Sequence, residues 1–450
     1  MDLPELFETH TRALLGEEYD SFVAALSSDS PASIRINPRK FANKPKFDPV
    51  LWCEYGYYIP QRPVFTMDPL FHAGSYYVQE ASSMFLEQAV KQYLDKENPL
   101  ALDLCAAPGG KSTHLASLLN GKGVLVSNEI IRSRAKILAE NLTKWGAPNV
   151  VVTNNDPRDF SPFNGLFDLI VVDAPCSGEG MFRKDPQSIG EWSVNNVHLC
   201  CERQKRIIAD VFPALRTGGL LVYSTCTYNR EEDEEIVRWI MEELGAESLP
   251  VKIEDSWNIT GSDSGYRFFP HKTKGEGFFL SVLVKTKGEN TFRIKSGKNE
   301  KIKKNQAFDS LKEWIVGDGY KQIIRSEDIS VIPTGYSDLI SILEKELKVM
   351  QSGVLLGRIK GKDILPDISL ALSWIINKRA FHVEKLTYEE AIAYLRKESL
   401  HFPEAPHGRI LLEFQNQLLG WAKNLGNRIN NTYPQEWRIR MEPVKTPLLR

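Results

Sequence analysis

Apolar and polar residues recur along the chain with two different periods, which separate predicted helices from predicted strands. Helical spacing over residues 5–15 and 19–26 predicts two helices near the start of the sequence. The segment "ASIRIN" at 32–37 alternates apolar and polar residues, as a half-buried strand does. Proline and aromatic residues crowd the segment "YGYYIPQRPVFTMDP" at 55–69, which predicts irregular, exposed structure there.

From residue 99 to residue 286, short apolar runs alternate with amphipathic segments. The runs are "LALDLCA", "GVLVSN", "VVVT", "FDLIVVD", "GGLLVYS" and "FFLSVLV". Helical segments lie between them, such as "IIRSRAKILAENLTKW" and a helix over about 196–215. Strands that alternate with helices predict a parallel, doubly wound sheet, and runs that are apolar on both faces fit strands covered by helices. The expected fold class is therefore α/β, with a Rossmann-like core.

These patterns divide the chain into five expected regions. They are an N-terminal α+β region over 1–98, the Rossmann-like domain over 99–286, a basic linker over 287–306, a small domain over 307–352 and a last domain over 353–450. The window 285–304 holds eight basic and two acidic residues. It is interpreted either as a solvated linker or as a contact with an anionic polymer.

Composition places the chain among ordinary globular proteins, with 42% hydrophobic and 25% charged residues and a formal charge of −2. No run of 18 apolar residues occurs, and the first residues do not resemble a signal peptide, so a cytoplasmic protein without membrane spans is expected. We also expect a monomer. Six cysteines stand at positions 53, 105, 176, 200, 201 and 226, and none forms the CxxC spacing of zinc or redox motifs.

The carboxyl ends of the predicted strands carry a glycine loop and three carboxylates, which is where ligands bind to open parallel sheets. The loop consists of Cys105, Ala106, Ala107, Pro108, Gly109, Gly110 and Lys111, and the carboxylates belong to Glu129, Asp156 and Asp173. The dinucleotide motif GxGxxG is absent, and Cys105 occupies the place of the first glycine of a phosphate-binding P-loop. An adenosyl group without phosphates fits better, so the expected cofactor is S-adenosylmethionine.

Two cysteines follow two of the predicted strands, Cys176 in "DAPCSGEG" and Cys226 in "STCTY". Neighbouring strands would bring both thiols to the pocket of the methyl donor. A thiolate is needed when the methyl acceptor is carbon 5 of a pyrimidine, because addition of sulfur to carbon 6 makes carbon 5 nucleophilic. Asp173 stands where a carboxylic acid could stabilise such an adduct at ring N3. From the residues alone, either cysteine could be the one that attacks.

The segments "DLCAAPGGKSTHLA", "DAPCSGEGMFRKDP" and "YSTCTYNREEDEEIV" resemble motifs of the Sun family of RNA (cytosine-5) methyltransferases, in the RsmF/YebU-like branch of bacterial rRNA enzymes. The resemblance implies that Cys226 is the nucleophile, that Cys176 acts in enzyme release, and that the glycine loop and its carboxylates bind S-adenosylmethionine. The segment "GWAKNLGNRINNTYPQEWRI" resembles the PUA-like RNA-binding domain of that branch. RNA, from the small ribosomal subunit or in that subunit, is the implied partner, with the N-terminal region also in contact with it.

A cytosine in a duplex cannot present carbon 6 to sulfur, so aromatic and basic residues are expected around the pocket of a flipped-out base. The candidates are Met181, Phe182, Arg183, Lys184, Arg267, His271, Lys272, Lys274, Arg438 and Arg440. Three alternatives stay open at this point. They are a noncatalytic RNA-binding assembly factor on a methyltransferase fold, a tRNA (cytosine-5) methyltransferase, and an amine or protein methyltransferase whose thiols only pack.

Overall fold

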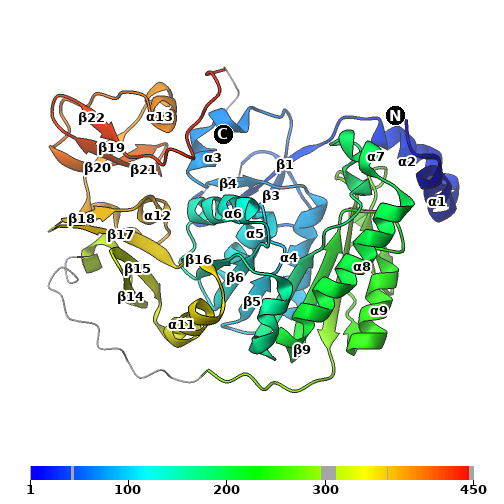
Figure 1. The fold of residues 1–450 in the computed structure, drawn as a ribbon. Helices are drawn as coiled ribbons and strands as arrows, with labels where there is room; N and C mark the ends of the chain where they lie inside the picture. Colours follow the sequence, from blue (N-terminus) through cyan, green and yellow to red (C-terminus); the bar gives the residue numbers. More distant parts are fainter. Residues whose placement is uncertain (1, 42–44, 295–310, 362, 445–450) are drawn as a thin grey trace.

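A computed structural model describes residues 2–41, 45–294, 311–361 and 363–444 of the chain. The expected basic linker at 287–306 lies outside the described residues from 295 onward. The strands form a ten-stranded sheet and three four-stranded sheets. Figure 1 shows the large sheet in the lower half of the molecule, with the N-terminal sheet above it and the two C-terminal sheets at the left.

The N-terminal region packs a small antiparallel sheet, in the order β2-β3-β1-β4, onto the large one. Its elements are α1 (Glu5–Leu15), α2 (Tyr19–Leu26), β1 (Ala32–Ile36), β2 (Asp48–Pro49), β3 (Gly56–Ile59), α3 (Pro69–His72), β4 (Tyr76–Val78) and α4 (Leu86–Tyr93). The prediction of irregular, exposed structure over 55–69 is wrong for β3, whose four residues are all buried, but it is confirmed for residues 60–62, which are exposed and lie outside any helix or strand. The expected half-burial of β1 is also wrong, since Ser33 and Arg35 lie inside, where both hydrogen-bond to Gln79.

The large sheet has the order β11-β12-β13-β9-β8-β5-β6-β7-β16, where β16 is Val349–Ser352, and its tenth strand, β10, pairs with β13 outside this order. Its elements from the catalytic region are β5 (Leu100–Asp103), α5 (Gly110–Leu119), β6 (Val124–Asn128), α6 (Arg132–Trp145), β7 (Val150–Thr153), β8 (Phe167–Asp173), α7 (Gln187–Glu191), α8 (Val194–Val211), β9 (Leu215–Thr225), α9 (Glu234–Leu244), β10 (Ala246–Ser248), β11 (Thr260–Ser262), β12 (Gly265–Phe268) and β13 (Phe278–Lys285). The five central strands, β9-β8-β5-β6-β7, are parallel, as predicted. Antiparallel strands extend the sheet on both sides, which the purely parallel prediction did not include.

Both faces of the parallel strands are covered, which explains their continuous apolar runs. Along β6, Val124 and Val126 face one hydrophobic core, whereas Leu125 faces another. This placement follows from the alternation of side chains along a strand. Because these strands are parallel, their carboxyl ends lie together at one edge of the sheet.

The C-terminal region contributes to three sheets. Its elements are β14 (Tyr320–Arg325), β15 (Asp328–Pro333), α11 (Ser337–Glu346), β16 (Val349–Ser352), β17 (Val354–Lys360), β18 (Asp363–Pro366), α12 (Ile368–Leu372), β19 (Val383–Lys385), α13 (Tyr388–Leu395), β20 (Gly408–Phe414), β21 (Gln417–Asn424) and β22 (Ile429–Asn431). The expected boundary at 352/353 does not separate sheets, because β15 pairs with β17 across it. In addition, β16 joins the large sheet beside β7.

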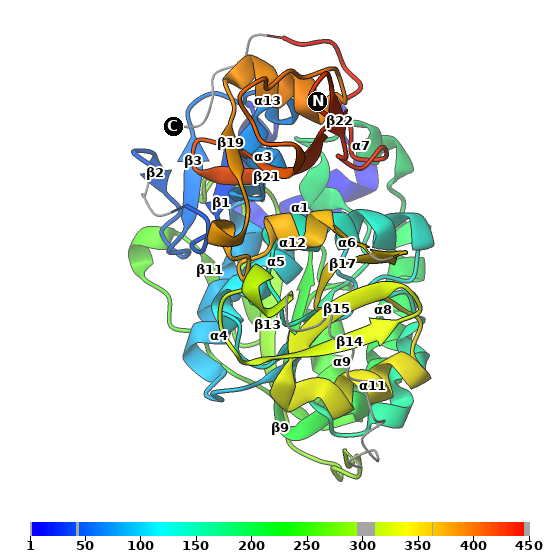
Figure 2. The ribbon, with the colours of Figure 1, turned by 90° about the vertical axis from the view of Figure 1, so that its left-hand side faces the viewer.

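The two ends of the chain share one hydrophobic core. Side chains of the β1–β4 sheet and of α3 pack there with side chains of α13 and of the β19–β22 sheet. Tyr388 on α13 donates a hydrogen bond to Met67 O at 3.0 Å, and the hydroxyl of Tyr433 lies 3.4 Å from His72 Nδ1. Figure 2 shows the orange and red C-terminal elements beside the blue N-terminal ones.

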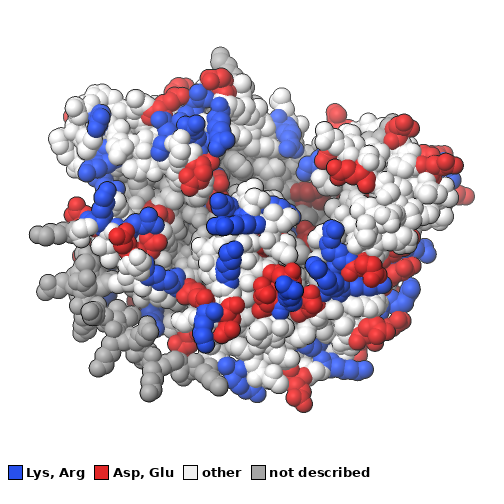
Figure 3. All heavy atoms as spheres, viewed as in Figure 1, with Lys and Arg blue, Asp and Glu red and all other residues white. Residues whose placement is uncertain are grey.

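The described helices include no membrane span, and the face seen in Figure 1 carries charges of both signs. None of these helices is both long and apolar enough to cross a bilayer. Figure 3 shows Lys and Arg side chains interspersed with Asp and Glu over the face seen in Figure 1, in keeping with the formal charge of −2. Any contact with a polyanion must therefore depend on local groups of cations.

Candidate active site

The predicted cofactor loop lies between β5 and the start of α5, at the carboxyl edge of the parallel strands. Gly109 has a φ of +120°, a conformation that side-chain-bearing residues rarely adopt. Arg134 and Asn141 on α6 hold the loop by donating to Ala107 O and Pro108 O, both at 2.8 Å. Side chains of α6 thus fix the position of the loop. The first N–H groups of α5 lack partners within the helix.

Three carboxylates gather close to this loop. Asp103 at the end of β5 is fully buried; its Oδ2 accepts from Ser112 at 2.6 Å, and its Oδ1 has no hydrogen-bond partner. Burial raises the pKa of Asp103 to about 7. Burial and the charges of Asp103, Asp173 and Glu129 raise the pKa of the Cys105 thiol. Two of these carboxylates are paired with cations, since Arg134 Nη1 lies 3.5 Å from Glu129 Oε2 and Lys111 Nζ lies 2.8 Å from Asp173 Oδ1.

Asp156, the remaining predicted carboxylate, follows β7 as expected but has a local role in the structure. Its side chain accepts from Arg158 N at 3.2 Å and caps a short helical segment, Pro157–Phe163. In return, Asp159 Oδ2 accepts a hydrogen bond from Asp156 N at 3.2 Å. A capping carboxylate keeps further lone pairs, so a role for Asp156 at the cofactor stays a prediction.

Asp173 connects the cofactor loop to the two cysteine-bearing strands. Its Oδ1 lies 2.8 Å from Lys111 Nζ and accepts a hydrogen bond from Ser224 Oγ, also at 2.8 Å. Among the described residues, both of these contacts go to Oδ1, and neither goes to Oδ2. The Asp173 side chain is 39% exposed, so a ligand can reach it.

The two predicted thiols meet at this point. Asp173 at the end of β8 pairs in register with Ser224 near the end of β9, so the strands deliver their following loops side by side. Cys176 Sγ and Cys226 Sγ are 3.0 Å apart, and Cys226 N donates to Cys176 Sγ at 3.3 Å. Both thiols are free and half-buried.

The pKa of Cys176 is raised. Its hydrogen bond to Cys226, burial and the charges of Cys226 and Glu232 raise this pKa well above the usual range of a thiol. Cys176 is therefore protonated at neutral pH, and the assignment of Cys226 as the nucleophile stays a prediction.

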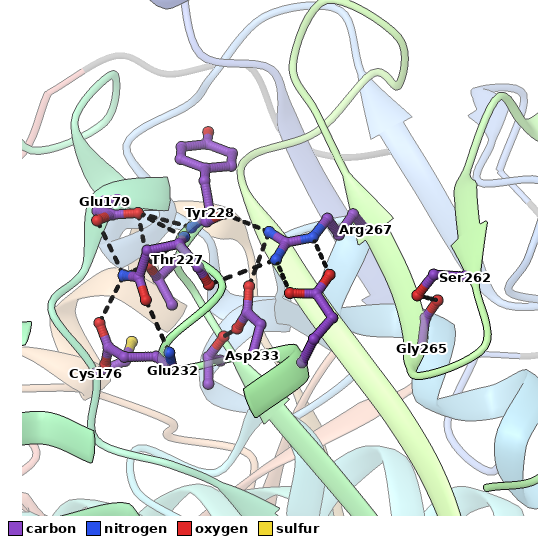
Figure 4. A network of polar contacts seen from close by, with 12 residues as sticks. Cys176, Glu179, Thr227, Tyr228, Glu232, Asp233, Ser262, Gly265 and Arg267 are labelled. Carbon is purple, nitrogen blue, oxygen red and sulfur yellow. Dashed lines mark hydrogen bonds and ion pairs between the residues drawn. The ribbon is translucent and has the colours of Figure 1, made fainter. Parts of the chain in front are cut away.

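Two buried glutamates hold the cysteine loops together, as Figure 4 shows. Glu179 Oε2 accepts from Thr227 Oγ1 at 2.7 Å and from Tyr228 N at 2.8 Å, and its Oε1 accepts from Trp192 Nε1 at 2.8 Å. Glu232 makes the reverse contact, from the loop of Cys226 to the loop of Cys176. It follows Cys226 in sequence and accepts from Ser177 N, next to Cys176, at 3.0 Å. Each loop thus supplies a carboxylate to the backbone of the other.

Sequence reasoning missed these glutamates and Asp103. Glu179 was visible as the acid in "PCSGEG", and Glu232 lies in the acidic run "REEDEE". Acids in turns and at the start of helices are usually solvated, so neither position gave a signal of burial. Only the cross-loop contacts identify them.

Several residues expected to contact RNA are buried instead. Phe182 is fully buried and packs on Phe7, with ring centroids 5.0 Å apart, so the prediction that it rims the pocket is wrong. Arg183 Nε lies 2.9 Å from Glu276 Oε2, and the buried guanidinium of Arg267 pairs with Asp233 at 2.9 Å. These two cations are neutralised inside the protein.

Other candidates remain accessible. The structure exposes the side chains of Lys184, Lys274, Arg438 and Arg440. Lys272 Nζ lies 2.8 Å from Glu18 Oε2, and His271 Nε2 lies 3.5 Å from the same oxygen. RNA contact by the exposed group stays a prediction.

One further group of potential metal ligands occurs among residues 2–41, 45–294, 311–361 and 363–444. Cys53 Sγ and His114 Nε2 lie 3.1 Å and 3.0 Å from Glu87 Oε2. Lys91 Nζ pairs with the other oxygen of Glu87 at 2.7 Å. Because the charge of Glu87 is already balanced and the three groups hydrogen-bond to one another, the cluster is explained as a polar junction between the N-terminal region and α5.

Three family descriptions match successive parts of the chain. Residues 92–284 match the 16S rRNA methyltransferases RsmB/F, and residues 3–81 match the N-terminal domain of 16S rRNA methyltransferase RsmF. Residues 381–439 match the PUA domain of methyltransferase RsmF. The last match begins well after residue 353, where sequence patterns placed the domain.

Relatives match the chain along nearly its whole length. The ribosomal RNA small subunit methyltransferase F of Escherichia coli O157:H7 is 32% identical over an alignment of 473 positions, which covers 96% of each chain. The protein of the same name from Shigella dysenteriae serotype 1 is 32% identical over an alignment of 472 positions, again covering 96% of each chain.

Solved structures share the catalytic fold. A methyltransferase homologue from Pyrococcus horikoshii aligns with a TM-score of 0.54 and 27% identity over 63% of this chain and 95% of that chain. NSun6 from the same organism, solved with SFG, aligns with a TM-score of 0.53 and 22% identity over 63% of this chain and 99% of that chain.

Proposed function

The chain belongs to the RsmF-type 16S rRNA methyltransferases, and from this premise we propose that it methylates carbon 5 of a cytosine in 16S rRNA through a transient bond to Cys226 Sγ. The observation that carries the proposal is the pair of free thiols 3.0 Å apart at the carboxyl edge of the sheet. Lys111 of the glycine loop reaches Asp173, which lies three residues before Cys176. The sulfur atoms and the loop therefore belong to one site.

The residues at this edge fit S-adenosylmethionine. The partnerless Oδ1 of Asp103 is a buried acceptor. The loop from Cys105 to Lys111, with Glu129 and Asp173, would hold the cofactor, and Glu129 is placed after β6 to accept from ribose hydroxyls. S-adenosylmethionine, when bound, supplies an electrophilic methyl group on a sulfonium.

The two thiols have different roles in the reaction of the base. Cys226 Sγ attacks carbon 6 of the cytosine, which makes carbon 5 nucleophilic. Asp173 Oδ2, which neither Lys111 nor Ser224 contacts, stabilises the adduct at ring N3. After carbon 5 has been methylated, its proton passes to a water molecule, the electron pair of the C–H bond forms the double bond between carbons 5 and 6, and the bond to Cys226 breaks to release a thiolate. Cys176 holds its proton 3.0 Å from the departing sulfur and stabilises it by a hydrogen bond.

Substitution of the two cysteines tests this assignment. Cys226→Ala removes the nucleophile and is expected to abolish transfer of tritiated methyl to 16S rRNA. Cys176→Ala removes the release group and is expected to accumulate a protein–RNA adduct that survives denaturation. Cys201→Ala, which removes a buried thiol on α8, serves as the control and is expected to keep activity. Wild-type turnover by Cys226→Ala would refute the mechanism.

The proposal includes the partner and its setting. The relatives' name points to RNA of the small ribosomal subunit, and a cytoplasmic monomer is the expected form. Bisulfite sequencing of RNA from cells with and without the gene locates the modified cytosine and distinguishes rRNA from tRNA. Sedimentation of the full chain measures its oligomeric state.

A further inference from the structure

We propose that Cys176 and Cys226 are also an oxidation site, at which a hydroperoxide converts the two thiols to an intramolecular disulfide. Their sulfur atoms lie 3.0 Å apart, and both residues are free and half-buried. The covalent change rests on this geometry alone. Its consequence for methyl transfer, a reversible arrest of the enzyme, rests on the proposed function.

The backbone already brings the two residues together. Two backbone hydrogen bonds join the two loops on either side of Cys176. Ala174 N donates to Ser224 O at 2.8 Å, and Gly180 N donates to Cys226 O, also at 2.8 Å. A disulfide requires sulfur atoms about 2.05 Å apart, so the two sulfur atoms have to approach each other by roughly 1 Å.

The contacts that hold the loops do not use the thiols and would survive oxidation. Glu179 binds Thr227 Oγ1 and Tyr228 N, and Glu232 binds Ser177 N. These buried contacts keep each sulfur beside the other whatever the redox state. Such fixed proximity gives a high effective concentration of one thiol at the other.

The other cysteines are poor competitors for the oxidant. Cys53, Cys200 and Cys201 are buried, with 4%, 3% and 8% of their surface exposed. Cys105 is half-buried, but burial and nearby carboxylates raise its pKa, so it carries little thiolate. A base-binding site must be open to solute, so a small hydroperoxide reaches Cys226 first.

The reaction balances with a hydroperoxide as the oxidant. Cys226 thiolate attacks the terminal oxygen; an S–O bond forms, the O–O bond breaks, and the leaving alkoxide takes a proton to become an alcohol (water in the case of H₂O₂). Cys176 Sγ then attacks the Cys226 sulfenic acid, an S–S bond forms, the S–O bond breaks, and hydroxide leaves with the Cys176 proton as water. The thiols lose two electrons and two protons in total.

Peptide mapping tests the bond independently of activity. The reduced full chain is freed of reductant, treated with H₂O₂, alkylated and digested with trypsin without reduction. Trypsin places Cys176 in peptide 159–183, Cys226 in peptide 217–230, and Cys200 with Cys201 in peptide 185–203. We expect 159–183 joined to 217–230. Unmodified thiols, sulfinic or sulfonic acid on Cys226 without the joined pair, or a cross-link to 185–203 would overturn the proposal.

Matched variants separate this proposal from the proposed function. The double variant Cys200→Ser/Cys201→Ser is expected to give the same joined peptide, whereas Cys176→Ser leaves Cys226 to proceed to sulfinic acid. Oxidised wild-type enzyme is expected to lose at least about tenfold in methyl transfer and to recover it with a dithiol reductant. If the disulfide forms and activity does not change, the mechanism assigned to Cys226 fails while the oxidation site stands.

Discussion

At the scale of single residues, Glu179 determines the shape of the site without touching either sulfur. Its carboxylate accepts from the hydroxyl of Thr227, the backbone of Tyr228 and Asn229, and the indole of Trp192. All of these partners are donors, and three of them, residues 227–229, follow Cys226 in succession. A negative acceptor is therefore required at this buried position.

Glu179→Gln is expected to lower the kcat of methyl transfer by about 10- to 100-fold, because an amide nitrogen would face a backbone donor and displace the Cys226 loop. The free energy of unfolding should fall by about 1–3 kcal/mol for the unsatisfied groups. Initial rates at saturating RNA and cofactor, together with denaturant unfolding, measure both effects. Glu235→Gln makes the same chemical change at an exposed position on α9 and should leave both values unchanged. An unimpaired kcat for Glu179→Gln would contradict the role assigned here.

At the scale of elements, three loops pack so closely that only glycine fits between them. A Cβ at Gly180, in the short helix Glu179–Met181, would lie 2.4 Å from Gly277 O and 2.9 Å from Cys226 O. Both neighbours are backbone atoms, which cannot rotate away. The lack of a side chain at Gly180 therefore allows three segments to pack together: the loop after β8, the loop after β9 and the residues just before β13.

Gly180→Ala is expected to separate the cysteine loops and to lower the kcat by at least about tenfold, with less adduct trapped in a Cys176→Ala background. The control is Gly190→Ala in α7, where a Cβ meets nothing within 4 Å. That change should be neutral or slightly stabilising, as for other exposed helical glycines. Equal activity of the two variants would show that the close packing does not position Cys226.

At the scale of the whole molecule, the N-terminal and C-terminal regions form one body over the edge of the catalytic sheet. His72 lies within their shared core, where its Nε2 is 2.9 Å from Thr66 O and its Nδ1 faces the hydroxyl of Tyr433. Burial, together with the charge of Lys144, lowers the pKa of His72 to about 3. The interface is therefore built around a neutral imidazole.

This placement predicts an acid-sensitive interface. Between pH 6.5 and about 3 the unfolded chain binds a proton at His72 that the folded chain excludes, so stability falls as the pH falls through that window. By pH 5 the loss from this residue should be about 2 kcal/mol. Thermal unfolding at pH 7 and pH 5 should show a smaller drop in Tm for His72→Asn than for wild type. His407→Asn, at an exposed histidine, is the control expected to keep the wild-type difference; an equally large drop for His72→Asn would refute the assignment.

Much of the fold could be predicted from the chain because the responsible interactions are local or periodic. The helix predicted at residues 5–15 coincides with α1, Glu5–Leu15, since its spacing of apolar residues reflects one buried face. The segment 55–69 was misread because proline and tyrosine are usually exposed, whereas β3 is covered on both sides by other parts of the chain. For the same reason Phe182 was assigned to RNA although it packs on Phe7, a partner far away in sequence.

By itself, the sequence determined which chemistry is possible. It supplied thiols after two buried strands, a glycine loop and acidic strand ends, because parallel strands must bring their carboxyl ends to one edge. The tertiary structure decided the rest: the order of β5, β8 and β9 that leaves Cys176 and Cys226 3.0 Å apart, and the hydrogen bond, burial and nearby charges that raise the pKa of Cys176. Distances and burial between residues fifty positions apart depend on packing in three dimensions, and no local pattern encodes them.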